Sequence, residues 1–587
     1  MMGRYLAVIG TPDRPIPDRE AIAEGARTAG LEICHSDARL FVAVSAALTH
    51  HHLGEDRGMV IGEVFSRGTN LASSAESIGR MLAERPVDAD HLVTRFWGNY
   101  VALLRTPGSG EITVLRAPFG KLPCLYGFKD GMRIAASDVA ALAIAGVGVG
   151  NPDARALAER LAFPGLPGQG TCLTGIGNLP GGAALLIGPG GASTGEAWSP
   201  WPHAERAQWY ETMEQAQHEV RSAIYQALRA LRGDAAKTLL MLSGGIDSSI
   251  LAACLSSLGG EYRCANFVHE DSSGDERNWA RMVARHLGCQ LEEFDFPLSA
   301  VDVTRSESAD LPSPGSRVFM QGTNAALASA ANAIGADLTL DGGGGDNVFL
   351  ALNSVAPVTD ALRHADTYET VWSCARTVAA LGQAGALEVL WRAARRRFRR
   401  SATFRWRPDL ALLAPDAIAN LASQAPHAWL SAPGKAEHGT AAHVAVIAAA
   451  QGWAEDCDLL SPVRHISPLA SQPVVEACLR VPSWWWFRDG RSRIIARDAF
   501  ADRLPREIVM RQSKGSPESF VADVYCKNRE TVRSMLLDGN LRRLGLIDSD
   551  AVERATSDTG PIRDTAHRRL LQLSQVEAWL AAQRPQS

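Results

Sequence analysis

"LLMLSGGIDSSILAACL", residues 239–255, joins two apolar runs through two glycines, an aspartate and two serines. The first run is apolar at successive positions, which is typical of a strand buried on both faces of a parallel sheet. After the turn, apolar residues recur at helical spacing, at Ile250, Leu251, Cys254, Leu255 and Leu258. Gly259 then provides a residue type that commonly ends a helix. The stretch therefore predicts a strand, a glycine loop and a helix, with the loop at the sheet edge where such folds bind ligands.

The glycine loop, residues 243–249, has the composition of an anion-binding site. Gly244 and Gly245 allow the backbone to approach a ligand closely, and the N-terminus of the following helix offers N–H groups that suit phosphate. Asp247 would repel a phosphate unless a cation lay between them, and Mg²⁺ resolves that conflict. The loop lacks the lysine of a Walker A loop, which excludes that motif. The alternative is an ordinary glycine turn with a serine cap.

A second glycine loop follows in "DLTLDGGGGDNVF", residues 337–349, where a short apolar run again leads into glycines and an aspartate. Four successive glycines cost a structured loop much backbone entropy, which makes sense where chain and ligand must approach closely. We expect Asp346 to supply a second carboxylate to the same metal ion as Asp247. The alternative is a flexible glycine loop.

The pattern of apolar residues along the chain changes near residue 200. Before it, short apolar runs such as "YLAVIG", "NYVALLR" and "EITVLRAP" are separated by Gly and Pro, which predicts mostly strands. Residues 199–209 read as a linker. From about 210, strand-like and helix-like segments alternate, which favours a parallel sheet with helices on both faces, and beyond about 360 the chain is mainly helical. We expect two domains, residues 1–200 and 210–587.

Overall composition excludes several classes. The net charge of −5 gives no basic surplus for nucleic acid, and no apolar stretch reaches the roughly 18 residues of a membrane span. The ten cysteines are scattered without a C-x-x-C pair, so we expect reduced thiols in a cytoplasmic protein rather than a zinc site.

These features resemble the asparagine-synthetase-like ATP pyrophosphatase family. "SGGIDSS" is similar to its pyrophosphate loop and "DGGGGDNVF" to its second metal-binding loop. Two later segments also resemble the family: "SPVRHISPLASQPVVEACLRVP" (461–482) and "RIIARDAFADRLPREIVMRQSKGSPESF" (493–520). Three N-terminal segments resemble its amidotransferase-type domain: "RAPFGKLPCLYG" (116–127), "IAASDVAAL" (134–142) and "TCLTGIGNLPGG" (171–182). The resemblance implies an α/β fold: an amidotransferase-like (Ntn-type) α+β sandwich, then a parallel-sheet ATP pyrophosphatase domain with a helical C-terminal part.

Two departures from the family pattern narrow the activity. A working glutaminase of this family has cysteine directly after the initiator methionine, whereas this chain has Met2 and then Gly3, so we expect no ammonia from glutamine. Gly343 replaces the acid that handles protons in asparagine synthetases. Two branches without an ammonia supply remain, the β-lactam synthetases and the lasso peptide cyclases (macrolactam synthetases). "GGGGDNVF" and "PLASQPVVEACLRVP" resemble the cyclases more closely.

The resemblance also implies a reaction. ATP and Mg²⁺ would activate an Asp or Glu side chain of a linear precursor peptide as an acyl-adenylate, and the N-terminal amine of that peptide would close a macrolactam ring. Asp247 and Asp346 would hold Mg²⁺. The residues expected to bind ATP are Ser243, Gly244, Gly245, Asp247, Ser248, Ser249, Phe267, Val268 and Gly344. A leader-binding protein and a leader protease are implied as partners. The rival activities are β-lactam or asparagine synthesis on a small amino acid; a non-enzymatic scaffold is a further alternative.

Positive charge is needed where negative charge grows in both steps. The resemblance assigns Lys514, in "RQSKG", to the family's catalytic lysine loop, with Arg511 as a second candidate. No proton acceptor is evident from the sequence. Four residues that follow the second predicted strand could lie near the site, although charged residues after a strand are usually solvated: His269, Glu270, Asp271 and Glu276. The arginine-rich run 391–400 favours a solvated helix face, with an acidic leader peptide or partner as the alternative.

Overall fold

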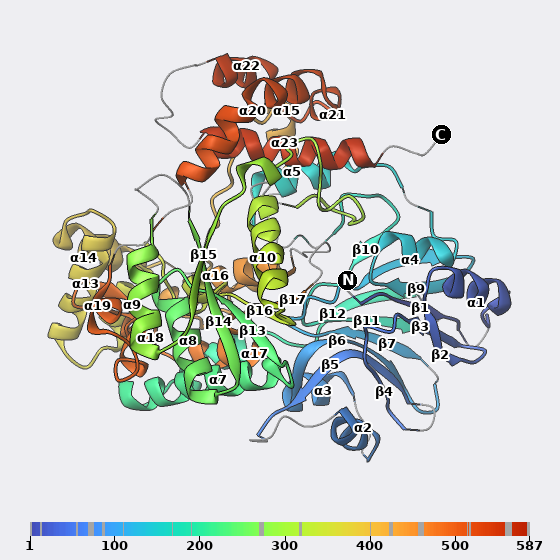
Figure 1. Cartoon of the computed structure of the whole chain (residues 1–587), viewed down its shortest axis with the longest axis horizontal. Coiled ribbons are helices and arrows are strands. Elements are labelled where there is room, and N and C mark those ends of the chain that lie inside the picture. The colour runs from blue at the N-terminus through green and yellow to red at the C-terminus, as the bar shows by residue number, and fades with distance from the viewer. Residues whose placement is uncertain are drawn as a thin grey trace.

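The computed structural model covers the chain as two β-sheet units and a set of C-terminal helices (Figure 1). The residues that it describes are 3–11, 14–54, 57–68, 75–84, 88–109, 111–148, 150–166, 168, 170–188, 191–268, 275–315, 320–399, 401–421, 427–455, 463–512, 515, 518–557 and 566–583. Within them, no helix is long and apolar enough to cross a membrane.

The N-terminal unit is a sandwich of two antiparallel six-stranded sheets, with strand orders β10-β8-β9-β1-β3-β2 and β12-β11-β7-β6-β5-β4. The first sheet consists of β10 (Gly177–Asn178), β8 (Leu125–Lys129), β9 (Met132–Ala136), β1 (Tyr5–Ile9), β3 (Leu40–Val44) and β2 (Glu32–Ser36). The second consists of β12 (Gly191–Glu196), β11 (Ala183–Gly188), β7 (Ile112–Arg116), β6 (Phe96–Arg105), β5 (Gly58–Ser66) and β4 (His50–His52). We call this unit the N-terminal sandwich.

Strand β1 shows how alternation builds these layers. Tyr5, Ala7 and Ile9 belong to the core between the two sheets, whereas Leu6 and Val8 belong to a core on the other face. Helices α1 (Arg19–Thr28) and α4 (Val139–Ile144) supply the residues that cover this second face. Successive side chains of a strand point to opposite faces, so a strand covered on both sides is apolar throughout.

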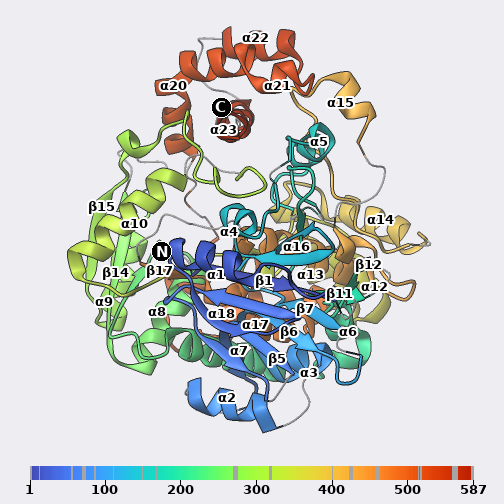
Figure 2. The same ribbon diagram turned by 90° about the vertical axis from the view of Figure 1, so that its right-hand side faces the viewer.

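The second unit is a parallel sheet of order β15-β14-β13-β16-β17. Its strands are β15 (Leu291–Asp295), β14 (Glu261–Val268), β13 (Lys237–Met241), β16 (Leu338–Leu340) and β17 (Arg464–Ile466). The surrounding helices include α7 (Met213–Arg232), α8 (Ile246–Leu258), α9 (Arg277–Leu287) and α10 (Met320–Ile334), and Figure 2 shows this unit beside the sandwich. The carboxyl ends of β13, β14 and β16 lead into the loops that form the candidate site.

Most of the remaining helices follow β16 in the chain. They include α11 (Gly345–Val348), α12 (Ala356–His364), α13 (Tyr368–Leu381), α14 (Ala386–Arg397), α16 (His438–Glu455), α17 (Gln472–Leu479), α18 (Ile494–Ala499), α20 (Glu518–Asp538) and α23 (Ala566–Ala582), with shorter helices between them. In Figure 1, α20 and α23 stand apart from the parallel sheet, at the top of the view.

The predicted fold class is confirmed, with two details corrected. Residues 199–209 are not a plain linker, because they form the short helices α6 (Trp201–Ala204) and η1 (Arg206–Gln208), and the Trp201 Nε1 group donates to the carbonyl of Trp429 at 3.2 Å. The mainly helical region beyond 360 also contributes a strand, β17, to the edge of the parallel sheet. At three residues, β17 is too short for periodicity to reveal.

A buried polar chain joins the sandwich to helix α16. Gln451 donates through Nε2 to the carbonyls of Pro118 and Gly181, both at 2.9 Å. Its Oε1 lies 3.0 Å from Nε2 of His427. Since a buried amide that loses a partner costs about 1–3 kcal/mol, this chain fixes how α16 sits against the sandwich.

Two buried histidines predict a loss of stability in mild acid. Burial lowers the pKa of His427 and that of His443 from 6.5 to about 4. Between these two pKa values the unfolded chain binds more protons than the folded chain. The stability that the two neutral histidines contribute is therefore fully present above about pH 6.5 and is lost as the pH falls towards 4. We expect the melting temperature to fall between pH 7 and pH 5, and to fall less in a His427→Gln/His443→Gln double variant. Thermal unfolding followed by circular dichroism measures this. The exposed His286→Gln variant is the control, and an unchanged pH dependence in the double variant would contradict the assignment.

Candidate active site

The loop between β13 and α8 is held by its own serines. The Gly245 amide donates to Ser243 Oγ at 3.2 Å, and Ser248 Oγ donates to the Gly245 carbonyl at 3.2 Å. Gly244 has φ +71°, and a Cβ there would lie 2.5 Å from the backbone carbon of Trp279. Only glycine fits this position, because helix α9 packs directly on the loop.

The second glycine loop packs against the first. A Cβ on Gly342 would lie 2.9 Å from the backbone nitrogen of Ser248, and one on Gly345 would lie 2.6 Å from Cγ of Asp247. Gly344 has φ +77°. We expected the glycines to admit a ligand. The structure shows that at least two of them admit the neighbouring loop, which brings the two acidic loops together.

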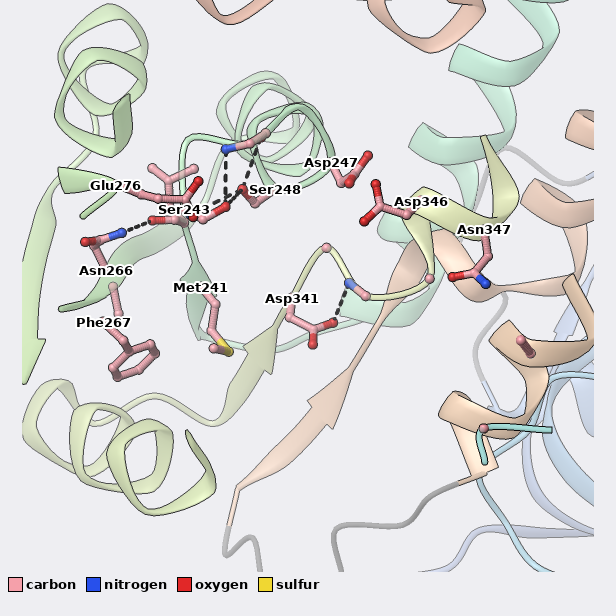
Figure 3. A pocket seen from close by; sticks show the side chains of 18 of the residues that line it. Met241, Ser243, Asp247, Ser248, Asn266, Phe267, Glu276, Asp341, Asp346 and Asn347 are labelled. Carbon is pink, nitrogen blue, oxygen red and sulfur yellow. Dashed lines mark hydrogen bonds between the residues drawn. The ribbon is translucent and has the colours of Figure 1, made fainter. Parts of the chain in front are cut away.

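Asp247 and Asp346 converge on one cation, the guanidinium of Arg493. Nη1 of Arg493 lies 2.9 Å from Oδ2 of Asp247 and 2.5 Å from Oδ1 of Asp346. Figure 3 shows the two carboxylates facing each other from their two loops. Burial lowers the pKa of Arg493, but the two carboxylates outweigh burial and raise it above its ordinary value. Two acids nearly a hundred positions apart in the sequence thus share one positive charge.

This donor set fits a divalent cation. Two carboxylate oxygens from separate loops approach a single positively charged atom, and Mg²⁺ in nucleotide sites is bound by one or two carboxylates together with substrate phosphates. Asp247 is 6% exposed, so its charge is expensive unless it is paired.

A cavity of about 680 Å³ opens in front of both loops. Seven of the residues predicted to bind ATP or metal line it: Ser243, Gly245, Asp247, Ser248, Phe267, Gly344 and Asp346. Three do not: Gly244, Ser249 and Val268. Gly244 packs on α9, and the fully buried Ser249 donates from Oγ to the Gly245 carbonyl at 2.8 Å. Val268 follows Phe267 in β14, where successive side chains point to opposite faces.

Other parts of the chain complete the cavity wall. Pro164 and Gly165 come from the N-terminal region, and Trp406 comes from the segment after α14. Because residues of both units form the cavity wall, no single sequence motif predicts it. The arginine-rich helix α14 itself is mostly exposed, as expected, and Arg395 stacks on Trp391 at 4.6 Å.

The predicted catalytic lysine, Lys514, lies outside the described residues, as do His269, Glu270 and Asp271. Arg511 is described and is 8% exposed. Its Nη2 donates to Glu276 Oε1 at 2.7 Å, and its guanidinium lies 4.6 Å from the ring centre of Trp279. The Gly515 amide donates to the same oxygen at 3.0 Å. Glu276, which lines the cavity, therefore holds both Arg511 and Gly515 beside it.

Arg493, Asp341 and His465 were not singled out from the sequence. Arg493 opens the 493–520 segment that carries the family resemblance, but a single arginine gives no sign that it will meet two distant acids. Arg493 has φ +62°, an unusual conformation for a residue with a side chain, which directs it between the two loops.

The family model described as asparagine synthase matches residues 219–581. A carboxyethyl-arginine beta-lactam-synthase from Streptomyces clavuligerus is 28% identical over 308 residues, which is 49% of this chain. The match spans 55% of the length of that relative.

Solved structures with local similarity are amidotransferases and enzymes of purine biosynthesis. A glutamine phosphoribosylpyrophosphate amidotransferase from B. subtilis has 10% identity and a TM-score of 0.21, covering 52% of this chain and 83% of that one. The allosteric regulatory enzyme of purine biosynthesis has 11% identity and a TM-score of 0.22, covering 58% of this chain and 89% of that one. The family model, which spans well over half of the sequence, is the finding that identifies the protein: the chain belongs to the asparagine synthase family.

Proposed function

We propose that the protein is an ATP-dependent, AMP-forming amide ligase and, within that class, a lasso peptide cyclase. The observation that carries the ligase assignment is the convergence of Asp247 and Asp346 beside the cavity formed by the two glycine loops. The finer assignment rests on the resemblance of the "GGGGDNVF" and "PLASQPVVEACLRVP" segments to the cyclases. The proposal divides the chain into residues 1–200, a structural platform, and 210–587, the synthetase.

The first step activates a carboxyl group. Ser243, Gly245 and Ser248 would bind the triphosphate at the N-terminus of α8, where free amides and the helix dipole favour anions. Asp247 and Asp346 would hold Mg²⁺, which when bound neutralises phosphate charge. A side-chain carboxylate of the peptide attacks the α-phosphorus of ATP, forming the acyl-adenylate and releasing pyrophosphate.

The second step closes the ring. The N-terminal amine of the same peptide attacks the activated acyl carbon, the new amide forms and AMP leaves. Holding the amine beside the acyl group can contribute about 7–11 kcal/mol to such a step. At about 680 Å³, the cavity lies within the range of roughly 300–1,000 Å³ for small-molecule sites, and its wall contains Trp406 and Gly165 as well as the nucleotide loops. Such a wall supports a substrate that extends beyond ATP.

On this proposal, the linear precursor peptide is the substrate, and a leader-binding protein and a leader protease act on it beforehand. The second candidate is ring closure within a small β-amino acid, to give a β-lactam. It is supported by the similarity to the carboxyethyl-arginine beta-lactam-synthase. Both candidates use the same adenylation machinery, so the two are distinguished by the substrate that is cyclised, a linear peptide or a small β-amino acid.

Mass spectrometry of the reaction separates the candidates. Incubation with ATP, Mg²⁺ and a linear core peptide that carries a free N-terminus and an internal Asp or Glu is expected to yield AMP and a product lighter by one water. The same peptide with an acetylated N-terminus is the control and should give no ring. If AMP forms with a carboxyethylated amino acid and with none of the linear peptides, the cyclase assignment is rejected in favour of a β-lactam synthetase.

A further inference from the structure

Ring closure releases a proton from the attacking amine, and few groups near the reaction can receive it. The acids that line the described part of the cavity are Asp247, Asp346, Glu276 and Asp341. The first two are assigned to the cation, and Glu276 is engaged by Arg511 and the Gly515 amide. Gly343 stands where asparagine synthetases carry their proton-handling acid. Asp341 is therefore the acid of this wall that has no other assigned task.

Asp341 is held in a defined orientation at the end of β16. Its Oδ1 accepts a hydrogen bond from the Gly343 amide at 3.0 Å, as Figure 3 shows. Its Oδ2 lies 3.4 Å from Nε2 of His465. The other ring nitrogen of His465, Nδ1, lies 3.0 Å from Oγ1 of Thr339. The carboxylate faces the cavity, and the imidazole stands behind it.

The sheet register fixes this pair. Strands β16 and β17 run parallel, and Thr339 lies opposite His465 in their ladder. Asp341 follows β16 directly, so its carboxylate extends back over the next strand to reach the imidazole. An imidazole held at both nitrogens keeps one orientation, with Nε2 directed at the Asp341 carboxylate.

His465 also lines a second cavity, of about 110 Å³, which we call the junction cavity because it lies between the N-terminal sandwich and β17. Lys121 and Glu63 come to it from the sandwich side. Among the described residues, the buried polar atoms of its wall that have no hydrogen-bond partner include Ser471 Oγ and Gln472 Oε1. A polar cavity with unused hydrogen-bonding capacity can hold water beside the imidazole.

We propose that Asp341 accepts the proton of the attacking amine and that His465, acting through Asp341, takes it up on Nε2. This inference rests on the proposed function. In the step, the C–N bond forms, the bond between the acyl carbon and the AMP oxygen breaks, and AMP leaves with the electron pair. The N–H proton passes to the Asp341 carboxylate and then to Nε2 of His465, where it is held as an imidazolium 3.4 Å from the Asp341 carboxylate.

The charges around the pair suit this direction of transfer. Burial raises the pKa of Asp341, but His465, Ser467 and Lys121 lower it below its usual value, so the group is a carboxylate at neutral pH. A proton therefore does not stay on Asp341. The charged groups that face His465 are Asp341, Lys121 and the Arg464–Glu63 ion pair at 2.6 Å. The ion pair is internally neutralised, and the Asp341 carboxylate, at 3.4 Å, offsets the charge of the imidazolium beside the cationic Lys121.

The test uses the full-length protein with the cognate linear peptide and separates the two steps. Hydroxylamine traps the acyl-adenylate as a hydroxamate and reports activation without an attack by the peptide amine. His465→Gln is expected to slow ring closure about 100-fold, the scale of general-base catalysis. Hydroxamate formation should change less than about threefold, since activation does not use the pair. Asp341→Asn should show the same split.

Ring closure and hydroxamate formation falling in parallel would show a structural role for the pair and overturn the proposal. Unchanged ring closure in both variants would overturn it too. If the unmodified protein forms neither AMP nor hydroxamate with any peptide, the proposed function fails, and this inference falls with it. That outcome is distinguishable, because it does not depend on either variant.

Discussion

Asp247→Asn is expected to abolish AMP release while leaving the fold intact. The substitution keeps the size of the side chain and removes one of the two charges that converge on a single cation position. Without the Asp247 charge, the cation that balances the growing phosphate charge during adenylation is no longer held. The rate of AMP release should fall about 10³-fold, the scale seen when a principal electrostatic stabiliser is removed. Asp346 still pairs with Arg493 in this variant, so the melting temperature should change little.

AMP release measured by chromatography tests this expectation, together with the melting temperature of the variant. Asp502→Asn is the matched control, because Asp502 forms an ion pair with Arg221 at 2.8 Å and is 61% exposed in its side chain. The control should retain full turnover. Undiminished AMP release by Asp247→Asn would show that the loop does not hold the cation.

The elements of the two sheets were predictable because their patterns are local. Residues 239–255 change from an apolar strand to helical spacing at one glycine pair, and the structure has β13 and α8 on either side of it. The strand β1 is apolar throughout because both its faces are covered, which is also visible from the sequence. Asp247 and Asp346 could be named from their loops alone, and the structure brings them together.

Contacts between distant segments were not predictable in the same way. Arg493 reaches both acids only because the left-handed backbone at its own position directs it there, and no periodicity reports a φ angle. The Asp341–His465 pair depends on the register of β17, a three-residue strand in a helical region. The glycine run was read as room for a ligand, whereas Gly342 and Gly345 give room to the Asp247 loop. Each miss is a tertiary contact between segments that the sequence treats separately.

Arg493→Met is expected to make the stability of the protein depend on Mg²⁺. Methionine keeps an unbranched chain of similar length but removes the positive charge that lies between Asp247 and Asp346. Breaking a buried pair costs about 3–5 kcal/mol. We expect the lower end, about 3 kcal/mol, because the side chain of Asp346 is 43% exposed and solvent screens it. A divalent cation that binds between the two acids should restore most of this loss.

Thermal unfolding with and without millimolar Mg²⁺ measures the effect, and Arg493→Lys is the matched control because it keeps one positive charge. Mg²⁺ should raise the melting temperature of Arg493→Met clearly more than that of the unmodified protein or of Arg493→Lys. In the unmodified protein, the ion must compete with a guanidinium that already occupies the position between the acids. An equal response to Mg²⁺ in all three proteins would mean that the cation binds elsewhere.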